Sequence, residues 1–324
     1  MIGSTIAHKL VQQGANVTIV DSCIAPYGAN MFNLHEINDK VNVNICDIRD
    51  KEAIKYLVKD KDAIFNLAGQ VSHNDSLNDP LLDADINYLG HLNVLECVRK
   101  YNPKAVILYP GSRLQFGEIK ENPVNEAHPL EPKTPYALNK TAAENMYKFY
   151  YNFHKINCVL FRIANPYGPR SQMQHNKYSL INWFIRQAME NKIIKVFGSG
   201  DQIRDYIYVE DLAEAFIMAS NNPKCYGETF NIGSGKGTKL KDMVKAIIKI
   251  VGSGRSENVP WPENYVNVET GDYVSDISKF SKTTGWRAST DIINGIEKTY
   301  SYYLKNRSHY WECSSSHKYS VALT

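Results

Sequence analysis

The sequence predicts an α/β fold, in which a doubly wound parallel sheet is followed by a smaller mixed α/β unit. Its first half alternates β-rich runs with helical stretches, a rhythm typical of parallel strands with helices on both faces. The opening MIGSTIAHKLVQQGANVTIVDS has the pattern of a helix, a tight turn, a strand and an acidic residue. That order matches the later part of a βαβ unit that binds a dinucleotide. After about Pro166 the rhythm loosens into shorter elements.

In the opening unit, Ser4 is expected to cap a helix whose apolar residues recur at helical spacing, and Gly14 to end it. The next strand, over 16–20, carries Asp21 at its tip. Further strands are expected over 41–45, 62–68, 104–110 and 157–163.

A long helix is expected to begin with Thr134 as N-cap and Pro135 as its first residue. In the second half the pattern predicts strands over 193–198 and 205–209. Helices are predicted over 181–189, from Asp211, from Thr238 and over 292–304.

Composition excludes several classes of protein. The chain has 324 residues, 43% of them hydrophobic, which is enough for a sizeable core. The net charge of +3 comes from mixed charges, so neither a nucleic-acid footprint nor a membrane patch is expected. No apolar run approaches the ~20 residues that span a bilayer, and the start does not resemble a signal peptide. Scattered cysteines without metal-ligand spacing indicate reduced thiols, no metal site and a cytoplasmic protein: Cys23, Cys46, Cys97, Cys158, Cys225 and Cys313.

The motif TPYALNK places Tyr136 and Lys140 on one face of a helix. A phenol is a poor base at neutral pH, but a nearby ammonium would lower the pKa of Tyr136 and make it a usable general base. With 21 tyrosines in the chain, such a pair alone is a weak signal. Ser112 strengthens it, because it follows a strand at the sheet edge where open α/β folds bind ligands.

Three further features agree with this site. Asp21 lies eighteen residues after Gly3, which suits a carboxylate that accepts from an adenosine ribose hydroxyl and disfavours a 2′-phosphate. Asp47 ends the next strand, and the small Ala68 and Gly69 end the one after, where a cofactor could approach the backbone.

The second half supplies groups for a diphosphate. Asn165 and Arg204 are expected in loops, and the planar guanidinium of an arginine is suited to a diphosphate.

Taken together, these motifs resemble an extended short-chain dehydrogenase/reductase of the NAD-dependent nucleotide-sugar epimerase/dehydratase family, with a UDP-glucose 4-epimerase-like pattern. The likeness runs from Ile2 to about Tyr303. It is carried by GSRLQFG, YALNK, RIANPYGPR, VFGSGDQIRDYIYVEDLAEA, ETFNIGSG and GDYVSDISK…GW.

The resemblance implies a Rossmann-like fold, NAD as cofactor and a nucleotide-diphosphate sugar as substrate. It implies that Ser112, Tyr136 and Lys140 are catalytic, and that Ser112, Asn165 and Arg204 contact the substrate. The cofactor-binding positions that it implies are Ile2, Gly3, Asp21, Asp47, Leu67, Ala68, Gly69, Asn87, Tyr136 and Lys140.

By the same resemblance, residues 1–165 form the NAD-binding domain, to which a segment of about 203–220 returns. Residues 166–307 are mainly the substrate-binding domain, and residues 308–324 are a tail. A homodimer is implied through the helices over 85–101 and 134–149, which offer Ile86, Leu89, Leu92, Met146 and Phe149. The alternative is that these side chains pack inward on the sheet.

The beginning of the chain departs from the family. The family motif is roughly TGGAGFIGS after a first strand, and only IGS is found here. The first strand and most of the glycine-rich turn are therefore expected to be missing, through a mis-set start, a fragment or a true truncation. Loss of a mid-sheet strand would leave unpaired backbone on its neighbours.

The residues after Ser112 bear on the reaction. Family 4,6-dehydratases carry an Asp-Glu pair there, whereas this chain has Arg113 and Leu114, which cannot act as that acid and base. We therefore expect 4-epimerisation through a transient 4-keto sugar, with Tyr136 as base. The alternatives are a nucleotide-sugar ketoreductase or dehydratase, and a truncated inactive relative. Glu269 stands where such epimerases often have a second diphosphate arginine, so the sugar and the base stay open.

Overall fold

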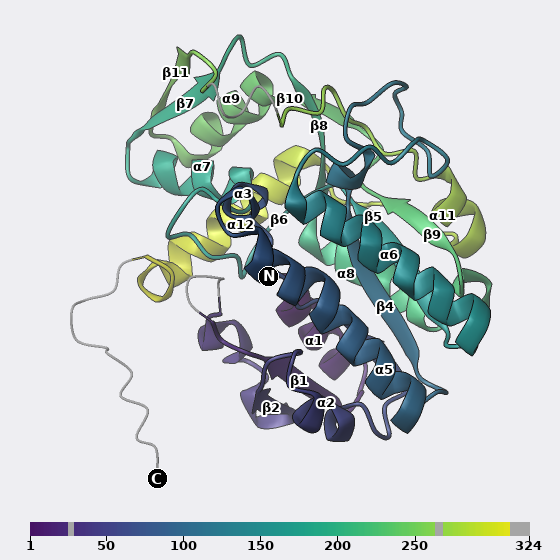
Figure 1. Ribbon diagram of the computed structural model, residues 1–324. Helices are drawn as coiled ribbons and strands as arrows, with labels where there is room; N and C mark the ends of the chain where they lie inside the picture. The colour runs from purple at the N-terminus through teal and green to yellow at the C-terminus, as the bar shows by residue number, and fades with distance from the viewer. Residues whose placement is uncertain (25–28, 263–267, 312–324) are drawn as a thin grey trace.

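The computed structural model of the chain describes residues 1–24, 29–262 and 268–311. In chain order (Figure 1), the first half contains α1 (Ile2–Gln12), β1 (Val17–Asp21), η1 (Met31–Leu34), η2 (Asn38–Lys40), β2 (Val41–Ile45), α2 (Lys51–Leu57), β3 (Ala63–Phe65), α3 (His73–Asn78), α4 (Pro80–Ala84), η3 (Asp85–Gly90), α5 (His91–Tyr101), β4 (Val106–Ser112), η4 (Arg113–Phe116), α6 (Pro135–His154) and β5 (Cys158–Ile163).

The second half contains β6 (Asn165–Tyr167), α7 (Leu180–Met189), β7 (Ile193–Phe197), β8 (Ile203–Tyr208), α8 (Val209–Ser220), η5 (Pro223–Cys225), β9 (Thr229–Ile232), β10 (Gly237–Lys239), α9 (Leu240–Val251), β11 (Arg255–Val259), α11 (Ser278–Thr284), α12 (Ile292–Asn306) and η6 (Arg307–His309).

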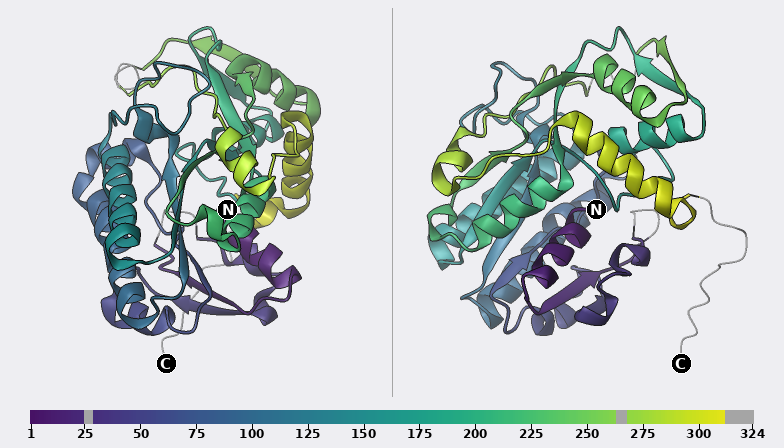
Figure 2. Two further views of the ribbon diagram at one scale, coloured as in Figure 1. Left: turned by 90° about the vertical axis from the view of Figure 1, so that its right-hand side faces the viewer. Right: turned by 180° about the vertical axis from the view of Figure 1, so that it is seen from behind.

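The predicted doubly wound parallel sheet is confirmed. Strands β3, β4, β5 and β9 pair in that order and all run parallel. Alternate residues of β4 face opposite layers, as the pleat of a strand requires. Ile107 and Tyr109 pack with α5 and α6, whereas Val106 and Leu108 pack with α1 and α8. Helices therefore lie on both faces of this sheet (Figure 2).

The described strands do not form one continuous sheet. β1 and β2 make a separate parallel pair with its own small core. Among the described strands, β1 pairs only with β2 and β3 only with β4, and residues of both β1 and β3 line the same cavity. The expectation that a first strand is missing stays a prediction.

A second group of elements surrounds a different core. β6, β8 and β10 form a mixed sheet, and β7 pairs with β11 at the opposite end of the molecule from β1 and β2 (Figure 1). α7, α9 and α12 pack on these strands through apolar side chains that include Phe184, Ile247 and Ile296. The division into an NAD-binding and a substrate-binding domain stays a prediction.

Some local predictions are confirmed and others are wrong. Thr134 caps α6, accepting a hydrogen bond from the Ala137 N–H at 3.3 Å. Ser4, however, does not cap α1. Its hydroxyl lies inside the first turn and donates to the Met1 carbonyl at 3.0 Å, because the helix already begins at Ile2.

Two later helices begin elsewhere than predicted. The helix expected from Asp211 begins at Val209, and the one expected from Thr238 begins at Leu240, because Thr238 pairs with Arg204 across β10 and β8.

The first part of the expected tail is packed. The Tyr310 side chain is buried among Phe32, Tyr302 and Tyr303. The rest of the tail, 312–324 with Cys313, lies outside the described residues.

Candidate active site

A central cavity of about 1560 Å³ lies between α1, β1, the ends of β3 and β4, α6, β6 and β8. It exceeds the volumes of about 300–1,000 Å³ usual for ligand pockets, because it continues between β1 and β3. The sequence-predicted site residues all line this cavity except Asn87, whose side chain lies against Gly69. The structure therefore brings together residues that are far apart in the chain.

One end of the central cavity carries the two predicted cofactor carboxylates. Asp21 ends β1, and its Oδ1 accepts from the Cys23 N–H at 2.8 Å. Asp47 accepts from the Arg49 guanidinium at 2.7 and 3.0 Å, which holds the pKa of Asp47 below its usual range. Asp47 thus forms an ion pair with Arg49, whereas the Asp21 side chain is exposed to solvent.

Gly69 lets two polar side chains approach the backbone closely. A Cβ at this position would lie 2.9 Å from Asn87 Oδ1 and 3.5 Å from Lys140 Nζ. Asn87 Oδ1 is buried and has no hydrogen-bond partner among the described residues. Lys140, also buried, makes no hydrogen bond or ion pair through Nζ within the described part of the chain. Lys140 Nζ thus keeps the capacity to donate a further hydrogen bond, and Asn87 Oδ1 keeps the capacity to accept one.

Ser112, Tyr136 and Lys140 meet where β4 ends beside the first turns of α6. Burial raises the pKa of Tyr136 to about 12, although a hydrogen bond with Ser112 lowers it in part. The prediction that Lys140 lowers the pKa of Tyr136 is therefore wrong for the chain by itself, because loss of solvent around the phenol outweighs any stabilisation by the ammonium.

Lys140 is also desolvated. Burial lowers its pKa to about 8, and the negative charge of Asp83 acts in the opposite direction. Asp83 is fully buried and accepts from Asn139 at 2.8 Å and from Asn87 at 3.0 Å. Asp83 thus fixes Asn87 and supports the charge of Lys140, a role that sequence reasoning missed.

A hydrogen-bond chain attaches Ser112 to the helix that carries Tyr136 and Lys140. The Ser112 N–H donates to Gln115 Oε1 at 2.7 Å, and Gln115 Nε2 donates to Glu144 on α6 at 2.7 Å. Glu144 in turn accepts from the buried Arg162 of β5 at 2.7 and 3.0 Å. This chain fixes the position of the serine relative to the tyrosine.

The other end of the central cavity carries the predicted diphosphate residues. Asn165 lies in β6 and Arg204 in β8, not in loops as expected, because both segments pair within the mixed sheet. Arg204 forms an ion pair with Glu269 and donates to the Gly271 carbonyl at 3.0 Å.

Sequence reasoning missed two further groups at this end. Arg113 donates to Asn165 Oδ1 at 3.2 Å, and the Tyr206 hydroxyl is buried and lacks a hydrogen-bond partner among the described residues. From the sequence, Arg113 was noted only because it stands where family 4,6-dehydratases have an acidic residue.

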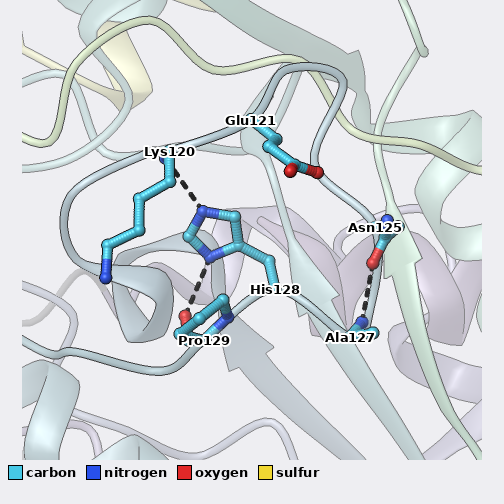
Figure 3. A pocket seen from close by; sticks show the side chains of 6 residues that line it. All are labelled: Lys120, Glu121, Asn125, Ala127, His128 and Pro129. Carbon is cyan, nitrogen blue, oxygen red and sulfur yellow. Dashed lines mark hydrogen bonds between the residues drawn. The ribbon is translucent and has the colours of Figure 1, made fainter.

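A second, smaller cavity of about 330 Å³ is lined by the loop before α6 (Figure 3). His128 accepts from the Lys120 N–H at 3.0 Å and donates to the Pro129 carbonyl at 2.9 Å. Asn125 accepts from the Ala127 N–H at 2.8 Å. These polar groups are satisfied within the loop, so this cavity is not a candidate active site.

Within residues 1–24, 29–262 and 268–311, no group of histidine, cysteine and acidic side chains could hold a metal ion. In the same ranges no helix is long and apolar enough to cross a bilayer. The cysteines there are free thiols: Cys23, Cys46, Cys97, Cys158 and Cys225.

Comparison with known proteins agrees with the fold and the motifs. The NAD dependent epimerase/dehydratase family matches residues 1–233. A Methanocaldococcus jannaschii protein grouped with the UDP-glucose 4-epimerases is 32% identical over 309 residues, covering 94% of this chain and 96% of its own. CDP-paratose 2-epimerase of Salmonella typhi is 29% identical, covering 92% and 95%. The crystal structure of Thermotoga maritima UDP-glucose 4-epimerase with UDP-glucose superimposes with a TM-score of 0.87 at 26% identity, covering 95% and 96%.

The fold and these matches define an enzyme of the extended short-chain dehydrogenase/reductase class. Within that class, the chain belongs to the NAD-dependent epimerase/dehydratase family, whose relatives named above act on nucleotide sugars. Because these relatives differ in the carbon that they epimerise, the reaction of this chain has to be argued from its own residues.

Proposed function

We propose that the chain is an NAD-dependent 4-epimerase of a nucleotide-diphosphate sugar. The observation that carries the proposal is the meeting of Ser112, Tyr136 and Lys140 at the central cavity, with Arg113 and Leu114 after the serine. In this proposal Tyr136 accepts the proton of the sugar C4 hydroxyl, and Ser112 orients that hydroxyl by hydrogen bonding.

NAD would lie across the cavity from Asp21 to Lys140. The carboxylate of Asp21 suits the adenosine ribose, while Lys140 Nζ and Asn87 Oδ1, the two unsatisfied groups beside Gly69, suit the hydroxyls of the nicotinamide ribose. When bound, NAD supplies the hydride acceptor and a positive charge near Tyr136. A cation there favours the phenolate, which burial alone disfavours.

The residues after Ser112 favour epimerisation over elimination. A dehydratase needs an acid for the leaving hydroxyl and a base for the carbon beside the ketone. Arg113 is a guanidinium held by Asn165 and Thr270, and Leu114 is aliphatic, so neither fills these roles. A ketoreductase and an inactive relative are the remaining alternatives.

The decisive assay uses nucleotide sugars deuterated at C4, with UDP, CDP, dTDP and GDP as the nucleotide and no added reductant. We expect one of them to give the C4 epimer with the label retained at C4 and no net NADH. Stoichiometric consumption of NADH or NADPH, or a 4-keto-6-deoxy product, would contradict the epimerase. No turnover with any of them, and no bound NAD in the purified protein, would favour the inactive relative.

Tyr136→Phe provides the matched control, because it removes only the phenolic oxygen. It should abolish nearly all turnover while NAD binding is largely retained, whereas Lys140→Ala should weaken both.

Asp21 predicts a preference for NAD over NADP, since its carboxylate would repel a 2′-phosphate. Calorimetric titration should give clearly tighter binding of NAD, and Asp21→Ala should narrow the gap between the two cofactors. Equal affinities in the unmodified chain would count against this assignment.

A further inference from the structure

Two arginines bind adjacent residues at one end of the central cavity, since Arg113 donates to Thr270 and Arg204 to Glu269 and Gly271. Among the described residues, only Arg204 of the two forms an ion pair. Arg113 and Arg204 are both largely buried, and the charge of Arg204 contributes to lowering the pKa of Arg113 to about 10, mainly a consequence of burial. Arg204 is paired with Glu269. In the described ranges no carboxylate oxygen lies within 4.0 Å of Arg113. A desolvated cation without a counter-ion indicates a site for an anion.

A third group points to the same place. The Tyr206 hydroxyl is buried in the wall of the cavity and has no hydrogen-bond partner among the described residues. Tyr206 pairs with Asn165 across β8 and β6, and Asn165 accepts from Arg113, so Tyr206 lies at the same end of the cavity as the two arginines. An unsatisfied buried hydroxyl is costly unless a ligand completes its hydrogen bonds.

Glu269 already behaves as an anion bound at this place. One of its carboxylate oxygens accepts from Arg204 and from the backbone N–H groups of Thr270 and Gly271, both at 3.0 Å. Successive backbone N–H groups beside a guanidinium form a concave anion site that a phosphate oxygen fits equally well.

From these contacts we infer that Arg113 is the second cation of the diphosphate site. It acts with Arg204 and Tyr206, and the diphosphate displaces the Glu269 carboxylate from the backbone of Thr270 and Gly271. The inference rests on the proposed function for the identity of the substrate. It assigns to Arg113, beside the catalytic serine, the role that related epimerases give to an arginine at the position of Glu269.

Displacement of Glu269 makes the site selective for a diphosphate over groups that carry a single negative charge. A group with one negative charge gains little by replacing a carboxylate that is already in place. A diphosphate carries more negative charge and can bridge both arginines, so its interactions can offset the loss of the Glu269 contacts.

The test uses inorganic diphosphate as the probe, titrated calorimetrically into the full chain with NAD saturating so that the cofactor site is filled. Arg113→Met should weaken binding at least tenfold, and Glu269→Gln should strengthen it several-fold, because the internal competitor loses its charge. Arg287→Met, which removes an exposed cation away from the cavity, is the matched control and should leave the affinity unchanged.

Three outcomes would overturn the inference. These are no binding of inorganic diphosphate at millimolar concentration, an unchanged affinity in Arg113→Met, and a weaker affinity in Glu269→Gln. If Arg113→Met does not fold, Arg113→Lys keeps the charge without the planar fork and should bind with reduced affinity. If the variants leave diphosphate binding unchanged while the chain epimerises a sugar normally, only this inference is rejected. If the affinities change as expected but no sugar is epimerised, only the proposed reaction is rejected.

Discussion

Asp83 is a buried carboxylate that acts on the proposed proton acceptor without touching the cavity. Both of its oxygens accept hydrogen bonds from asparagine side chains, and its charge raises the pKa values of Lys140 and Tyr136. Burial raises the pKa of Asp83 itself, so the group is poised closer to neutrality than an exposed aspartate.

Asp83→Asn should therefore shift the pH dependence of turnover. Without the negative charge, the pKa of Lys140 falls below about 8 and that of Tyr136 below about 12. The acid limb of the kcat/KM profile, which reports deprotonation of Tyr136, should move to lower pH. Asp85→Asn, two residues away and exposed, should leave the profile in place. An unchanged profile in Asp83→Asn would show that this carboxylate is only structural.

At the scale of elements, Glu144 joins η4, β5 and α6. Its side chain is fully buried and accepts from Gln115, Arg162 and Lys148. Removing one partner of a buried ion pair leaves the other charge uncompensated, which costs about 3–5 kcal/mol.

Glu144→Gln should thus lower the free energy of unfolding by ~3 kcal/mol or more at pH 7, measured by urea denaturation. The pKa of Glu144 is lowered in the folded chain, mainly by Arg162 against the opposing effect of burial. Its contribution is therefore present above the unfolded pKa and is lost as the pH falls through the folded one. At acidic pH, the free energies of unfolding of Glu144→Gln and the unmodified chain should therefore differ less than at pH 7. Glu52→Gln, on the surface of α2, should change stability little at either pH.

The helices of the expected dimer surface are apolar only in part. Ile86 is 8% exposed, and Leu92 and Met146 pack on the core, so these three are largely unavailable. Leu89 and Phe149 are 50% and 48% exposed, and they remain candidates for contact with a second copy.

We expect a homodimer by sedimentation equilibrium at micromolar concentration, and a monomer when Leu89 and Phe149 are both changed to Glu. Leu304→Glu, an equally exposed leucine on α12, is the control and should not alter the molecular mass. A monomeric unmodified chain would reject the dimer.

At the scale of the whole molecule, the sequence was sufficient to predict those features that depend on a single segment of the chain. The Thr134–Pro135 cap, the alternation of strands and the pairing of Tyr136 with Lys140 on one helix face all follow from neighbouring residues. The role proposed for Arg113 does not, because its hydrogen-bond partner Thr270 lies far along the chain. The pKa of Tyr136 also escaped prediction, since burial is a property of the packed molecule.

The divided sheet has a consequence for local opening of the molecule. The small core of the β1–β2 pair is formed by Ala7, Val17, Leu34 and Ile37, and the partly buried Leu10 packs both on it and on the larger core around β4 and β5. Such a unit can open by itself, so its amide protons should exchange with solvent faster than those of β4. A dinucleotide held by Asp21 at one end and by Lys140 at the other would join the two parts. NAD should then slow exchange in β1 more than in β4, and equal protection of both strands would contradict that bridge.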